Sequence, residues 1–238
     1  MAIHPGDETS HVTAVLDHDE DRSVLSAAHA MAGLLGVGTE SLQVGPDGHA
    51  TRVDLVVAAL GDDDVSAAVL SAKSPDALCW DVMARVSKPL LVLPRRGERI
   101  LHAISRVLLP LDGTPETAAG VAGAVRLMIA AGAEVKAVHV FDAATVPAFW
   151  DQAAHSHASW TEEFLRRNLP EPVQLDLRSG RTPEEVGAEA DRTDVDLIVM
   201  GWSRDLSAGK ARTVRRALTE GQVPVLLVST KRASPAGS

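Results

Sequence analysis

Two segments of this 238-residue sequence carry side chains whose types and spacing could do chemistry. The first is PLDGT at 110–114, in which an aspartate follows an apolar run and precedes a glycine. The glycine allows a tight turn, and the Asp112 carboxylate can accept hydrogen bonds from an adenine amine or a ribose hydroxyl. The alternative is that Asp112 only caps the next turn or helix, which is common for aspartate.

The second segment is MGWSRDLSAGKART at 200–213, where basic side chains gather near an expected helix amino terminus. Such a cluster can hold an anion through guanidinium contacts and the helix dipole, or it can be a solvated basic face balanced by nearby acids. The string GKART is not a P-loop, because the glycine required five residues before Gly209 is Arg204. The basic residues are Arg204, Lys210, Arg212, Arg215 and Arg216.

The elements that must position these segments form a repeat. VTAVLD at 12–17 aligns with VLLPLD at 107–112, DLVVAALG at 54–61 with DLIVMG at 196–201, and KPLLVLP at 88–94 with VPVLLVS at 223–229. Strands alternate with helical patterns, so the sequence predicts an α/β fold of two doubly wound, mostly parallel sheets. Ligands of such sheets bind at the carboxyl ends of the strands, where both chemical segments begin.

The two copies are unequal. Asp17 and Asp54 are 37 residues apart, whereas Asp112 and Asp196 are 84 apart, so the first copy lacks about 47 residues. We predict an abbreviated unit at 1–97 and a near-complete, five-stranded unit at 98–238. Only GPDGHATR separates two strands of the first copy, which predicts an extended crossover without a helix. Its loops HDED and GDDDVSAAVLSAKS are acidic and would repel a triphosphate unless a metal ion intervened.

The second copy is similar to the universal stress protein family over residues 105–231. The motifs that carry the resemblance are VLLPLDGTPET, AVHVFD, VQLDLRSGRTPEEVGAEADRTDVDLIVMG and RRALTEGQVPVLLVS. The resemblance implies the adenine nucleotide alpha hydrolase-like fold, a five-stranded parallel sheet that pairs through its last strand. We therefore expect PLLVLP at 89–94 and PVLLVS at 224–229 to pair within the chain, which would close two apolar edges.

Family members that hold ATP carry an aspartate after the first strand and the pattern Gly, two residues, Gly, nine residues, Gly, Ser or Thr. The sequence keeps Asp112 and the first glycine, Gly201, but has Arg204 at the second glycine position. Arg212 and Thr213 stand nearest the final pair, in a loop two residues shorter than the pattern. The resemblance implies Asp112 at the adenosine end, Gly201 at a close backbone approach, and Arg204, Arg212 and Thr213 at the phosphates.

We therefore expect a non-enzymatic protein of stress response or signalling, with at most one adenine-nucleotide or anion site, for ATP or AMP, in the second unit. One alternative is a nucleotide-independent scaffold or pseudo-dimer with degenerate sites, able to recruit a partner protein or form a homodimer. Another is a weak ATPase. No G-x-S-x-G nucleophile motif is present, so hydrolysis through a serine has no basis in the sequence.

Composition excludes other classes. A net charge of −9 repels phosphate backbones and argues against nucleic acid as a partner. No apolar run approaches the ~18 residues of a membrane span, and the first residues lack the basic and apolar regions of a signal peptide, so we expect a cytoplasmic protein. The single cysteine, Cys79, the histidine His139 and the aromatic residues Phe149, Trp150, Trp160 and Phe164 are expected to pack in the core or at an interface.

Overall fold

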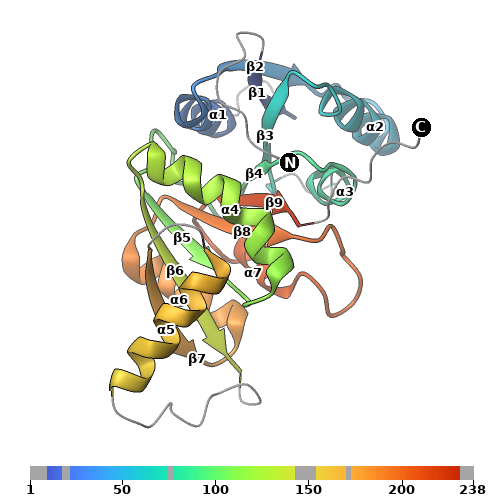
Figure 1. The fold of residues 1–238 in the computed structure, drawn as a ribbon. Helices are drawn as coiled ribbons and strands as arrows, with labels where there is room; N and C mark the ends of the chain where they lie inside the picture. The colour runs from blue at the N-terminus through green and yellow to red at the C-terminus, as the bar shows by residue number, and fades with distance from the viewer. Residues whose placement is uncertain (1–9, 18–21, 74–77, 143–153, 170–172, 231–238) are drawn as a thin grey trace, which may run out of the picture.

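The computed structural model describes residues 10–17, 22–73, 78–142, 154–169 and 173–230 (Figure 1). Within these residues the chain forms one nine-stranded sheet in the order β2-β1-β3-β4-β9-β8-β5-β6-β7. Strands pair in parallel inside each unit, and an antiparallel pairing of β4 with β9 joins the units. The prediction of an α/β fold is confirmed, but the two sheets that the sequence predicts are one continuous sheet.

The first unit has four strands and three helices among the described residues. Its elements are β1 (His11–Leu16), α1 (Arg22–Leu35), β2 (Gly38–Gln43), α2 (His49–Ala59), β3 (Val65–Ser71), α3 (Leu78–Arg85) and β4 (Leu90–Leu93).

The second unit has the five strands that the sequence predicts. Its elements are β5 (Arg106–Pro110), α4 (Pro115–Ala130), β6 (Glu134–Phe141), α5 (Ala154–Asn168), β7 (Gln174–Ser179), α6 (Thr182–Thr193), β8 (Leu197–Trp202), α7 (Arg212–Thr219) and β9 (Val225–Ser229). Helix α4 begins as its residues dictate, because the Thr114 hydroxyl accepts a hydrogen bond from the Thr117 amide and Pro115 needs no amide partner.

One strand assignment in the first unit is wrong. The run DLVVAALG, expected to be a strand after a helix-free crossover, lies mostly in α2, and the third strand is β3. Val53, Val56 and Leu60 are buried at spacings of three and four, which is the helical period. A short apolar run fits the pattern of a buried strand equally well, so periodicity could not distinguish a strand from a helix here. The connection from β2 to β3 is thus an ordinary helical crossover, and the first unit lacks one strand and one helix relative to the second.

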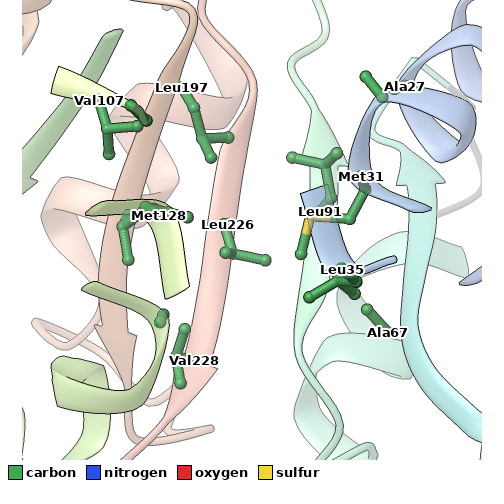
Figure 2. Close-up of a cluster of buried hydrophobic side chains, with 14 of the residues drawn as sticks. Ala27, Met31, Leu35, Ala67, Leu91, Val107, Met128, Leu197, Leu226 and Val228 are labelled. Carbon is green, nitrogen blue, oxygen red and sulfur yellow. The ribbon is translucent and has the colours of Figure 1, made fainter. Parts of the chain in front are cut away.

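The central junction pairs Leu90, Leu91 and Val92 of β4 with Leu227, Leu226 and Val225 of β9. This pairing satisfies the backbone groups of two apolar edge strands, as the sequence predicts. It also makes the core continuous. Figure 2 shows Leu91 beside Met31 of α1 and Leu226 beside Leu197 of β8, all within one buried cluster.

The sheet is covered on both faces. The cluster that contains Leu91 and Leu226 packs under α1, α4 and α5. Side chains that alternate with these along the strands form a second cluster under α2, α3, α6 and α7. Cys79 is buried in the second cluster, where burial raises the pKa of its thiol to about 12, as expected for a packing residue. Among the described residues, no helix combines the length and apolar character that a membrane crossing requires.

Candidate functional site at the strand ends of the second unit

A pocket of about 530 Å³ opens where β5, β6 and β8 end and α7 begins. Asp112, Gly201, Arg212 and Thr213 line it, so the fold brings together four of the five residues expected at a ligand site. Apolar side chains form much of its wall, including Val138, Val186, Met200, Trp202 and Val214. Arg204, the fifth residue, is not part of the lining. Its expected phosphate contact has no support from this geometry.

Asp112 is tied to the start of α4. Its Oδ1 atom accepts hydrogen bonds from the Thr114 amide at 2.9 Å and the Thr114 hydroxyl at 2.8 Å. Its Oδ2 atom accepts from the Thr117 hydroxyl at 3.0 Å. Gly113 has a φ of +80°, which provides the tight turn. The capping interpretation therefore describes the local bonds, yet the carboxylate also faces the pocket, and each oxygen can accept from more than one donor.

Gly201 is confined by two threonines. A Cβ atom at this position would lie 2.9 Å from Cγ2 of Thr230 and 3.0 Å from Cγ2 of Thr117, closer than atoms of side chains pack. A side chain at position 201 would therefore force one of these threonines to shift. The same lack of a side chain leaves the backbone at the end of β8 open to a ligand.

The segment between β8 and α7, residues 203–211, contains left-handed backbone at three positions. Arg204 has a φ of +60°, Gly209 of +81° and Ala211 of +54°. Arg204 therefore keeps a conformation that favours glycine, although its side chain departs from the family pattern. We name this segment the 203–211 loop.

The basic cluster divides into two groups. In the first, Arg204, Lys210 and Arg212 have no side-chain hydrogen bond or ion pair within the described part of the chain. In the second, Arg215 donates to the Leu206 carbonyl at 2.8 Å, and Arg216 pairs with Glu184 at 3.2 Å and with Glu220 at 3.3 Å. The first group supplies charge that the protein does not use internally, whereas the second has a structural role.

Sequence reasoning missed several polar residues of the lining, including Thr117, Asp142, Thr182 and Ser203. Asp142 and Ser203 follow directly on β6 and β8. The rule that ligands bind at strand ends would have identified Asp142 and Ser203 if it had been applied to every strand.

The corresponding position in the first unit holds an ion pair. Asp17, which follows β1 as Asp112 follows β5, forms an ion pair with Arg52 of α2. The exposed fraction is 18% for the aspartate side chain and 13% for the arginine, so the pair is largely shielded from solvent. Helix α2, which the sequence analysis did not predict, thus supplies a cation to the site position of its own unit.

The acidic run Asp62 to Asp64 precedes β3 and so lies at the opposite edge from the strand ends, contrary to expectation. Lys88 covers the backbone there, donating to the carbonyls of Asp62 and Val65, each at 2.8 Å. No group of side chains suited to holding a metal occurs among the described residues.

Aromatic residues pack beside the pocket. The Nδ1 atom of His139 must donate in its 2.8 Å hydrogen bond to the Leu111 carbonyl, because a carbonyl only accepts. The ring lies 4.7 Å from that of Phe164 and 5.5 Å from that of Trp160, between centroids. Phe164 is buried in the core as expected. Phe149 and Trp150 lie outside the described residues.

The fold and the pocket define a class: doubly wound α/β proteins whose ligand site lies at the carboxyl ends of parallel strands. The model of the universal stress protein family matches residues 103–229, and the chain belongs to this family. No curated protein matches the sequence.

Two solved structures are similar in fold over most of the chain. A functionally unknown protein from Pseudomonas aeruginosa PAO1 is similar over 92% of each chain, with 15% identity and a TM-score of 0.62. A universal stress protein from Archaeoglobus fulgidus DSM 4304 is similar over 93% of this chain and 86% of its own, with 13% identity and a TM-score of 0.58. At these identities the likeness concerns the fold, and it extends over both units.

Proposed function

We propose that the protein is a non-enzymatic universal stress protein, active in stress response or signalling, with one adenine-nucleotide or anion site in its second unit. The observation that carries the proposal is the pocket of about 530 Å³ that brings Asp112, Gly201, Arg212 and Thr213 together. Membership of the family supports the class of function.

The lining suits a ligand with an apolar end and an anionic end. Val138, Met200 and the other apolar residues offer a surface for a base, and Asp112 can accept from an amine or a ribose hydroxyl. Arg212 and Thr213, at the amino terminus of α7, offer a guanidinium, a hydroxyl and amide donors to a phosphate. ATP and AMP both have a largely apolar base at one end and phosphate at the other.

A single site per chain follows from the difference between the units. The Asp17 carboxylate in the first unit already faces the Arg52 guanidinium, whereas the three free cations of the described 203–213 segment lie in the second. Titration should therefore saturate at one nucleotide per chain.

Binding without hydrolysis is part of the proposal. Asp112, an acid of the pocket, already accepts three hydrogen bonds from Thr114 and Thr117, which suits a binding role better than proton transfer. Protein incubated with ATP and Mg²⁺ should release phosphate no faster than buffer alone. Release that depends on Asp112 would replace this proposal with the ATPase alternative.

Isothermal titration with ATP, AMP and adenosine tests the site. Arg212→Ala removes a charge-assisted hydrogen bond to phosphate and should weaken ATP by roughly 10- to 100-fold while changing adenosine little. Arg126→Ala, at an exposed position in the later half of α4, is the matched control and should bind as the wild type does. If neither ATP nor AMP gives heat at concentrations that detect micromolar binding, the site does not exist.

A nucleotide-independent scaffold is the second candidate. Two observations favour it: the Asp112 carboxylate is already bonded within the chain, and Arg204 stands where the family pattern has glycine. Absence of nucleotide binding by a folded chain, with capture of a partner protein that is unaffected by nucleotide, would support this candidate.

A further inference from the structure

Contacts at the start and in the middle of the 203–211 loop connect it to the first unit. At its start, the buried indole of Trp202 donates from Nε1 to the Met83 carbonyl of α3 at 3.0 Å. In its middle, the Leu206 carbonyl accepts from the Arg215 guanidinium at 2.8 Å. That guanidinium in turn lies 5.4 Å from the centroid of the Trp80 ring, also on α3.

The loop's internal hydrogen bonds are local. The Ser207 amide donates to the Asp205 carboxylate at 2.9 Å, and the Lys210 amide donates to the Ser207 carbonyl at 3.0 Å. Bonds between residues two and three apart shape the loop but do not orient it toward the pocket. Leu206 adds an apolar contact, since it packs against the same buried cluster as Trp80. These contacts connect the loop to α3, directly through Trp202 and indirectly through Arg215.

Helix α3 is itself braced by the rest of the first unit. Val82 and Met83 are fully buried. His49 of α2 contacts Asp81 at 2.7 Å, and Arg85 donates to Asp54 of α2 at 2.7 Å. A continuous chain of contacts thus runs from α2 through α3 to Arg215 on α7, one turn from Arg212 and Thr213.

We infer that α3 of the first unit positions the anion-binding half of the site in the second unit, with Trp80 and Arg215 as positioning residues. They hold the 203–211 loop and α7 so that Arg212 and Thr213 line the pocket. The part of this inference that concerns a ligand rests on the proposed nucleotide site. The first unit is then a working part of that site, although its own site position is occupied by the Asp17 and Arg52 pair.

Linkage makes the coupling reciprocal. If the packing of α3 favours the ligand-competent loop, then a bound phosphate must favour the packed state of α3 to the same extent. ATP should therefore slow amide hydrogen exchange in α3, and adenosine, which lacks phosphate, should not.

The first experiment uses the full chain without ligand. Trp80→Ala and Arg215→Ala should each raise amide hydrogen exchange in the 203–211 loop by several-fold, and Trp80→Phe, which keeps an aromatic face, should restore most of the protection. Arg215 is exposed, so its alanine variant should fold, which thermal unfolding checks. Arg126→Ala is the matched control. Unchanged exchange in both alanine variants would overturn the inference.

The second experiment compares ligands. Arg215→Ala should weaken ATP by roughly 3- to 10-fold and leave adenosine unchanged, because only the phosphate half of the site shifts. Equal weakening of both ligands would overturn a specific positioning role. If wild-type protein binds neither ATP nor AMP but the loop still gains exchange in both alanine variants, the nucleotide site is refuted and the positioning of the loop by α3 stands.

Discussion

Glu189 is the most deeply buried acid of the described chain, and replacing it with glutamine should cost much of the protein's stability. Its side chain is 1% exposed, and its carboxylate meets Lys136 at 2.7 Å, Arg178 at 2.8 Å and Arg192. Asp176 shares these cations, at 3.5 Å from Lys136, 2.8 Å from Arg178 and 3.1 Å from Arg192. We call these five residues the Glu189 network; it joins α6 to β6 and β7.

The magnitude follows from how exposed the partners are. Removing one member of a fully buried ion pair costs about 3–5 kcal/mol, because the other charge is left without compensation. Here the side chains of Lys136, Arg178 and Arg192 are 24%, 31% and 55% exposed, so water and Asp176 compensate part of their charge. We expect Glu189→Gln to lower the free energy of unfolding by about 2–3 kcal/mol. For a chain of this size that lowers the melting temperature by roughly 4–12 °C.

Differential scanning calorimetry and urea unfolding measure both quantities. Glu163→Gln is the matched control, since Glu163 pairs with Arg166 and Arg167 on the surface of α5 and should change the melting temperature little. A melting temperature of Glu189→Gln within a degree of the wild type would refute the reasoning. It would mean that the cost of burying the network cancels its attraction completely.

Three further changes probe other features. Gly201→Ala should lower the free energy of unfolding, measured in urea, by about 1–3 kcal/mol, because the added methyl group would meet Thr117 and Thr230. Replacing both threonines with serine in the same variant should recover most of this loss. Arg204→Gly should raise the free energy of unfolding by roughly 1 kcal/mol, because the φ of +60° is strained for arginine. An unchanged midpoint of urea unfolding would contradict this. Burial lowers the pKa of Lys136, but its hydrogen bond to Glu189 and the nearby negative charges outweigh burial and raise the pKa above its ordinary value. The resulting stabilisation is present below pH about 10.4 and is lost as the pH rises through the higher folded-state pKa, so wild type should lose stability more steeply above that pH than Lys136→Met.

The sequence alone predicted the repeat, the fold class and four residues that line the candidate site. Strand periodicity is local, so the runs ending near Pro110 and Gly201 could be recognised without any tertiary contact. Because parallel strands end at the same edge of a sheet, it followed that Asp112 and Gly201 would lie close together. Two apolar final strands with unmet backbone groups similarly predicted the pairing of β4 with β9.

Tertiary structure decided what local patterns leave open. The run from Asp54 to Gly61 fits a strand and a helix alike, and only the burial of Val53 and Val56 against the sheet selects the helix. That helix supplies Arg52, which forms an ion pair with Asp17 at the site position of the first unit. The bond from Trp202 to Met83 spans 119 residues, and no spacing rule predicts a contact between elements that meet only after both units have packed. The position of the candidate site could therefore be predicted from the order of its strands. The contacts between its loop and the first unit arise only from how the helices pack across the sheet.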